Sequence, residues 1–106
     1  MRTYCLTYDA VDSDKYKKDP NYFRRLIVKT LLENDCENFH MPVSSTIIFD
    51  YPFSLLDNLN LKFRIGVGAQ IYYNLCLVST NGNRSFIVGN PDNKLSQEFD
   101  EFVKSL

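Results

Sequence analysis

The chain opens with side chains that alternate between two faces, a pattern typical of a β-strand. In residues 1–9, Tyr4, Leu6 and Tyr8 fall on one face, and Asp9 closes the segment on the other. Aromatic and β-branched residues suit a pleated surface, whereas Asp is depleted in strands. The pattern therefore predicts a strand over residues 1–9 with a carboxylate at its tip.

Four later segments also have the composition of strands and are bounded by turn residues. They are 37–41, which stops at Pro42, then 44–49, which Ser44 and Ser45 begin, then 71–80 and 85–89. Asn81-Gly82 lies between the last two segments, and both residue types tolerate the positive φ of a two-residue hairpin turn. We therefore expect 85–89 to return as the antiparallel partner of 71–80.

Helical spacing appears once after a polar segment and once at the C-terminus. The polar residues 10–18 predict a loop, and Asp19-Pro20 then opens a helix, because Asp caps free amides and Pro fits the first turn. This helix is expected to end near Asn34-Asp35, and its buried stripe is Phe23, Leu26, Ile27 and Leu31. A C-terminal helix over 94–106 has an apolar face of Leu95, Phe99, Phe102, Val103 and Leu106.

Residues 54–67 fit two different elements. Leu55, Leu56, Leu59 and Phe63 suit one face of a helix, whereas Leu61, Phe63, Ile65 and Val67 alternate as in a strand. Gly66 and Gly68 would end either element, so periodicity leaves both readings open.

The order of elements favours an α+β fold over a doubly wound parallel sheet, because the strands are few and linked by hairpins. We expect one domain over residues 1–106, with an antiparallel sheet covered by helices on one face. The other sheet face is then left for solvent or for a second copy of the chain.

Composition narrows the class of protein further. The net charge of −1 gives no general electrostatic case for nucleic-acid binding, although half of the twelve cationic residues lie between Lys15 and Lys29. No apolar run approaches the roughly 18–20 residues of a membrane span, and a cytoplasmic protein is expected. The three scattered cysteines argue against a disulfide framework. Cys5 and Cys76 lie in strand segments and are expected to be buried, and Cys36, in a polar loop, more exposed.

Most of the known catalytic, metal-binding and phosphate-binding motifs can be excluded, because the sequence lacks essential residues of each. Cys36 and His40 supply two zinc ligands where a structural site needs four. Asp12 and Asp14 resemble the start of a calcium loop, but Lys17 stands where such a loop requires glycine. A serine–histidine–carboxylate triad and a phosphate-binding glycine loop have no supporting motif.

Asp9 is the remaining candidate for chemistry. One carboxylate is too little for metal-assisted hydrolysis, but a two-fold axis near the strand tip would pair Asp9 with its copy. Two facing carboxylates could hold one Mg²⁺ ion, which would activate water at a phosphodiester. The alternative is that Asp9 hydrogen-bonds the backbone of the following loop.

The strand Tyr4-Cys-Leu-Thr-Tyr8-Asp9, followed by a loop and a helix and then by Ser44-Ser-Thr-Ile-Ile-Phe49, resembles small ferredoxin-like proteins related to the second CRISPR-associated protein. That group includes virulence-associated protein D toxins and a set often labelled SinR-like. In this set a His often precedes a Ser-Thr-aromatic strand, as His40 precedes Ser45-Thr46 here. The resemblance covers residues 2–79.

The resemblance implies a ferredoxin-like sandwich and a homodimer, with 54–65 as the second helix and 71–79 as the fourth strand. It also implies an acidic residue at the end of the first strand, which Asp9 matches. Some members of the group are metal-dependent nucleases, and others have a structural or adaptor role. The strand 84–89 and the helix 94–106 are additions to the minimal fold, and the added strand could pair with a partner subunit.

Two functions follow as hypotheses. The first is a non-catalytic homodimeric interaction module that engages a protein partner, from a mobile-element, defence or toxin–antitoxin system. The second is a Mg²⁺-dependent endoribonuclease that acts as a homodimer through Asp9. In that case the phosphates of RNA or DNA would contact Lys15, Lys17, Lys18, Arg24 and Arg25.

Overall fold

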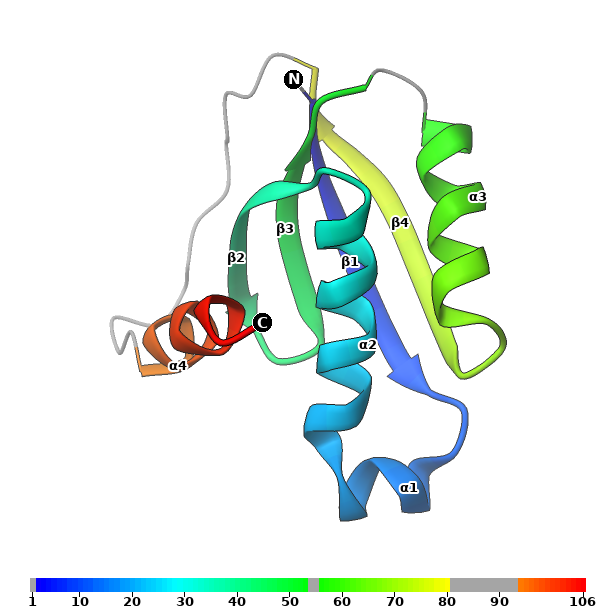
Figure 1. Ribbon diagram of the computed structural model, residues 1–106, viewed down its shortest axis with the longest axis vertical. Coiled ribbons are helices and arrows are strands. Elements are labelled where there is room, and N and C mark those ends of the chain that lie inside the picture. The colour runs from blue at the N-terminus through cyan, green and yellow to red at the C-terminus, as the bar shows by residue number, and fades with distance from the viewer. Residues whose placement is uncertain (1, 54–55, 81–93) are drawn as a thin grey trace.

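A computed structural model describes residues 2–53, 56–80 and 94–106 (Figure 1). Its elements are β1 (Arg2–Ala10), α1 (Ser13–Lys18), α2 (Pro20–Glu33), β2 (Glu37–Val43), β3 (Thr46–Tyr51), α3 (Leu56–Val67), β4 (Ile71–Ser79) and α4 (Lys94–Lys104). The expected hairpin at Asn81-Gly82 and the strand 85–89 lie outside the described residues.

The four strands form one antiparallel sheet in the order β2-β3-β1-β4. Each of the helices α2 and α3 connects two parallel strands that have a third strand between them. Both helices therefore return across the same face of the sheet, as the handedness of such crossovers requires. Figure 1 shows α2 in front of the sheet and α3 beside β4. This α+β arrangement confirms the predicted fold class and is that of a ferredoxin-like sandwich.

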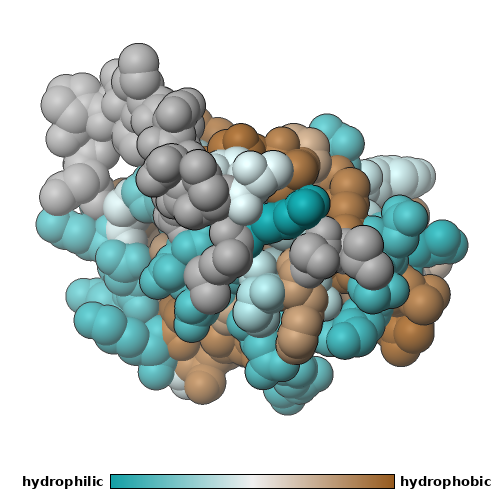
Figure 2. All heavy atoms as spheres, turned by 90° about the horizontal axis from the view of Figure 1, so that it is seen from above, coloured by the Kyte–Doolittle hydropathy of each residue, from teal (hydrophilic) through white to brown (hydrophobic). Residues whose placement is uncertain are grey.

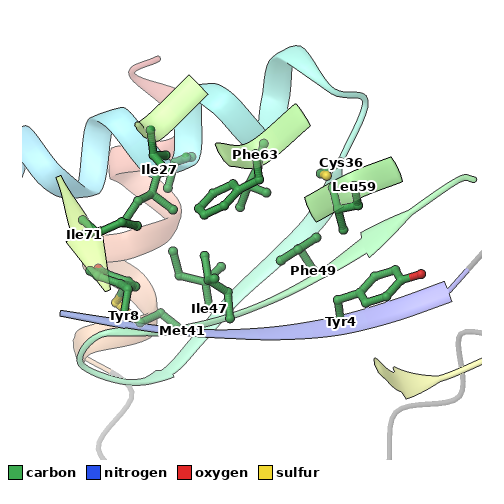
Figure 3. Packing of buried hydrophobic residues seen from close by; sticks show 14 of the residues in the cluster. Tyr4, Tyr8, Ile27, Cys36, Met41, Ile47, Phe49, Leu59, Phe63 and Ile71 are labelled. Carbon is green, nitrogen blue, oxygen red and sulfur yellow. The ribbon is translucent and has the colours of Figure 1, made fainter. Parts of the chain in front are cut away.

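The core lies between the helices and one face of the sheet, and this face is the one predicted from the alternating apolar residues of the first strand. Tyr4, Leu6 and Tyr8 are buried on β1. Figure 3 shows side chains from α2 and α3, such as Ile27 and Phe63, directed toward Ile47 and Phe49 of the sheet. The remaining β1 positions, with Cys5 and Asp9 among them, therefore point to the opposite side, which we call the second face.

The helix α4 adds to this layer, as its sequence pattern predicted. It packs on β2, and Phe99 is fully buried in the core, with Leu95, Phe102 and Val103 partly buried beside it. Leu106, expected on the same apolar face, follows the helix and is exposed. Among the described residues no helix is long and apolar enough to cross a membrane.

The ambiguous segment is resolved as the helix α3, with Leu59, Phe63 and Val67 on its buried side. Gly66 lies inside this helix, so the expectation that it ends the element was wrong. Gly68 does terminate it, with a φ of +61° and an N–H that donates to the carbonyl of Arg64. A left-handed residue at this position is a common helix ending that glycine adopts without strain.

Three local predictions were wrong. Residues 10–18 are not wholly a loop, because Asp12 accepts a hydrogen bond from the Lys15 amide and caps the short helix α1. The second strand continues through Pro42, which is tolerated because β2 is an edge strand. Ser45, expected to enter a strand, instead forms the β2–β3 turn with Ser44, at a φ of +64°.

The predicted exposure of the cysteines was reversed. Cys36 is buried, Cys76 is exposed and Cys5 is intermediate. Strand position alone was a poor guide, because Cys5 and its cross-strand neighbour Cys76 lie on the second face rather than in the core.

Candidate functional site

Asp9 lies near the end of β1 on the second face, with its side chain exposed. Its neighbour across the strand pair is Tyr72 of β4, which is 66% exposed. The strand continues for one residue to Ala10, and the Val11 amide donates to the carbonyl of Gln70. Asp9 is therefore a surface carboxylate near a strand end, as the sequence predicted, and its role stays a prediction.

The predicted basic residues fall into two groups. Lys15, Lys17 and Lys18 are exposed on α1, which begins shortly after β1 ends and lies at the same end of the molecule (Figure 1). The Lys15 ammonium lies 3.9 Å from the centre of the Tyr22 ring, a distance typical of a cation–π contact. Lys17 and Lys18 have exposed side chains at this end.

Arg24 and Arg25 belong to α2 and are on the helical side of the sheet. The Arg24 guanidinium lies 5.6 Å from the centre of the Phe102 ring of α4. Burial raises the pKa of Tyr8, and the nearby Arg24 opposes that shift. Arg24 of α2 thus lies close to Phe102 of α4 and to Tyr8 of β1, which gives it a structural role. Arg25 is exposed.

The structure does not bring the whole predicted nuclease site together. Asp9 projects from the second face, whereas α2 covers the first, so the sheet separates its carboxylate from Arg24 and Arg25. Within the described residues there is no group of three or more His, Cys, Asp or Glu side chains placed to hold a metal ion. Asp12 and Asp19 are occupied as helix caps, because each accepts a hydrogen bond from an amide three residues ahead.

A different feature of the sheet was missed by sequence reasoning. In the described sheet, β4 pairs with β1 on one side only, so its other side is an edge. Its nine residues, IYYNLCLVS, include no charged residue and no proline. Natural edge strands usually carry such residues, which discourage pairing with another chain.

The other edge strand shows how this chain protects an edge. β2 contains Glu37 and Pro42, its pairing with β3 shifts register twice, and α4 packs on it. Charge, proline, irregular pairing and a covering helix are the usual protective devices. β4 has neither a charged residue nor a proline. This contrast with β2 makes the β4 edge the candidate interaction surface.

The helix α3 extends this surface on the helical side of the sheet. Ile65 and Leu61 of α3 are 76% and 61% exposed. Together with Ile71 and Tyr73 of β4, they line a depression of about 640 Å³. Figure 2 shows hydrophobic side chains at the surface on the right of the molecule, where α3 lies. We call the β4 edge with Leu61 and Ile65 the β4–α3 edge.

A second, more polar depression lies further along the same edge. It has a volume of about 420 Å³ and is lined by Leu56, Asp57, Asn60 and Arg64 of α3 and by Tyr73, Asn74 and Leu75 of β4. The Tyr73 hydroxyl donates to Asn60 Oδ1 at 2.6 Å and fixes α3 to the strand. Both depressions are thus formed by one strand and one helix at the edge of the sheet.

No protein-family model matches this chain, and comparisons with curated proteins and with solved structures give no significant match.

Proposed function

We propose that this protein is a non-catalytic interaction module that forms a homodimer through the β4–α3 edge. One observation carries the proposal: among the described residues, β4 is a nine-residue edge strand without a charge or a proline. Such a strand presents a row of backbone donors and acceptors, and pairing with another strand would satisfy them. A second copy of the chain supplies a strand with the same properties.

Symmetry makes β4 a suitable partner for itself. Two identical strands related by a two-fold axis run antiparallel, and the same patch is used on both copies. In such a dimer the two α3 helices flank the axis on the helical side of the sheet. Leu61 and Ile65 would then leave water, and burial of each side chain favours association by about 1.5–3 kcal/mol.

The catalytic alternative requires a different dimer, in which the two Asp9 carboxylates lie close together. Asp9 lies beside Tyr72, three residues from Leu75 at the middle of β4. In a dimer centred on Leu75, the two Tyr72 residues are six strand positions apart, or about 20 Å at about 3.4 Å per residue. The two Asp9 carboxylates would be at least as far apart, too far for one shared Mg²⁺ ion.

The proposed biological setting follows from the family resemblance. We place the module in the cytoplasm, in a mobile-element, defence or toxin–antitoxin system, where the dimer would present a protein-binding surface. The expected protein partner would contact the dimer rather than the separate subunits. RNA or DNA remains the partner of the alternative function, with Asp9 and the exposed lysines of α1 in contact with it.

The proposal is tested by sedimentation equilibrium with two matched lysine variants. Asn74 and Thr7 are cross-strand neighbours, both exposed, but Asn74 is on the edge strand and Thr7 is on the central strand. Asn74→Lys places like charges near the axis and should give a monomer, whereas the wild type and Thr7→Lys should sediment as dimers. A monomeric wild type, or dimers of both variants, would refute pairing at this edge.

A further inference from the structure

Two cysteine thiols lie side by side on the second face of the sheet. Cys5 of β1 and Cys76 of β4 are direct partners in the antiparallel register. The Cys76 thiol points to the Cys5 carbonyl oxygen, with 3.7 Å between Sγ and O. Cys76 is exposed and Cys5 is partly exposed, so small molecules in solution can reach the pair.

The strand geometry is compatible with a covalent bond between them. Residues directly opposite each other in an antiparallel pair have Cα atoms about 4.5 or 5.5 Å apart, depending on the hydrogen-bonding pattern. Both values lie within the roughly 4.4–6.8 Å that disulfides span. Joining the two sulfur atoms therefore requires side-chain rotation and no separation of the strands.

We propose that Cys5 and Cys76 form a reversible dithiol–disulfide couple that exchanges with small-molecule disulfides of the glutathione type. This assignment concerns the second face of a single chain and does not depend on the proposed dimer. It also gives a function to two cysteines whose side chains lie outside the hydrophobic core.

The two thiols have different roles in the exchange. Burial and the adjacent Cys76 raise the pKa of Cys5, which makes Cys5 the poorer first nucleophile. The more exposed Cys76, as its thiolate, attacks one sulfur of oxidised glutathione, and one glutathione thiolate leaves. Cys5 then loses its proton and attacks Cys76 Sγ, and the second glutathione thiolate leaves. Two protein thiols are oxidised, and one glutathione disulfide is reduced to two glutathione molecules.

The third cysteine provides an internal control. Cys36 is buried, and its burial together with nearby Asp35 raises its pKa to about 12. Burial and the raised pKa both disfavour its thiolate near neutral pH, and it should keep its thiol throughout the exchange.

A disulfide between Cys5 and Cys76 would also be detectable as an increase in the thermal stability of the protein. Cys5 and Cys76 are 71 positions apart in the sequence, and a disulfide that closes a loop of this size restricts the unfolded chain strongly. We expect oxidation to raise the melting temperature by roughly 5–20 °C. Reduction should reverse the shift completely.

The test is equilibration of the full chain in mixtures of reduced and oxidised glutathione, followed by acid quenching, denaturation and alkylation of free thiols. Mass spectrometry of the intact protein should show that two of the three thiols are lost together and that no glutathione is attached to the chain. Peptide mapping should then identify a disulfide between Cys5 and Cys76. In Cys5→Ser, Cys76 should stop as the glutathione mixed disulfide. Cys36→Ser should still form the bond.

Several outcomes would overturn the couple. Retention of all three thiols in excess oxidised glutathione would show that the pair does not exchange. Separate glutathione adducts on Cys5 and Cys76 in the wild type, or a disulfide between two chains, would show that the thiols act independently. Because Cys76 is exposed, Cys76→Ser is the variant least expected to disturb folding, and its Cys5 should stay largely unmodified.

Discussion

The backbone of Gly66 in α3 lies directly against the side chain of Thr30 in α2. A Cβ atom at Gly66 would come within 2.8 Å of Thr30 Oγ1 and closer still to its Cγ2. Thr30 cannot easily move away, because it is buried and its hydroxyl donates to the Leu26 carbonyl at 2.7 Å. This contact therefore sets how closely the two helices pack over the sheet.

We predict that Gly66→Ala destabilises the protein by up to about 2 kcal/mol. Alanine favours a helix over glycine by about 1 kcal/mol, but overpacking costs about 1–3 kcal/mol, and the fixed position of Thr30 makes the steric cost the larger effect. Urea unfolding of the single variants and of Gly66→Ala with Thr30→Ala forms a double-mutant cycle. The double variant should recover most of the loss. Strictly additive effects would show that the two residues are not in contact.

We predict different costs for two carboxylates of the same sheet. Asp50 is 6% exposed and accepts hydrogen bonds from Thr3 Oγ1 at 2.5 Å and from Asn38 Nδ2 at 2.8 Å. Asp50→Ala should cost about 1–3 kcal/mol, because the fully buried Thr3 hydroxyl loses its acceptor. The exposed Asp9→Ala should change the free energy of unfolding by less than about 0.5 kcal/mol. Equal effects on the denaturation midpoint would contradict this assignment of burial.

The buried thiol of Cys36 gives stability a specific pH dependence. Its pKa is raised to about 12 in the folded protein from an ordinary value of 9.0, so the folded state holds a proton that the unfolded state releases. The contribution is complete below pH 9 and falls between pH 9 and 12, by at most about 1.4 kcal/mol per pH unit. Unfolding under reducing conditions at pH 8, 9 and 10 would measure the slope.

The matched variant for this slope is Cys36→Ala. It should be less stable than the wild type at pH 8, and its stability should decrease less steeply above pH 9. A residual slope is expected, because burial also raises the pKa values of Cys5 and Tyr8. Identical slopes in the two proteins would exclude Cys36 as a contributor.

Asp9 provides the test of the catalytic alternative. We predict that wild type and Asp9→Asn, purified in parallel and incubated with RNA and Mg²⁺, show the same background cleavage. The physical reason is that a β4-paired dimer keeps the two carboxylates apart, and one exposed carboxylate supplies too few metal ligands. Cleavage by the wild type that the substitution abolishes would instead establish the endoribonuclease.

The sequence predicted the structural features that depend only on residues close together in the chain. Asp19-Pro20 marked the start of α2 because capping needs only the next few residues, and the Asp19 carboxylate does accept from the Tyr22 amide. The alternation of Tyr4, Leu6 and Tyr8 identified the core face of β1. The short helix α1 was missed, because a polar segment with an Asp cap resembles a loop.

Features that depend on strand order could not be read from the sequence. β4 becomes an edge only because β1 takes the central position between β3 and β4, and the same register brings Cys5 beside Cys76. The burial of Cys36 depends on the way the chain turns after α2, where Asp35 adopts a φ of +65°. For the candidate site, the sequence predicted the position of Asp9 near the end of the first strand but not its separation by the sheet from Arg24 and Arg25.

Hydrogen–deuterium exchange along β4, measured by NMR at several protein concentrations, tests the proposed dimer most directly. Alternate amides of β4 point to the edge, and we predict that these amides become protected as the concentration rises and remain unprotected in Asn74→Lys. Protection that is equal at all concentrations and persists in Asn74→Lys would mean that the chain covers its own edge, for instance with the strand predicted at 85–89. Unprotected edge amides in a sample that sediments as a dimer would place the interface elsewhere. Either result would contradict a dimer formed through the β4–α3 edge.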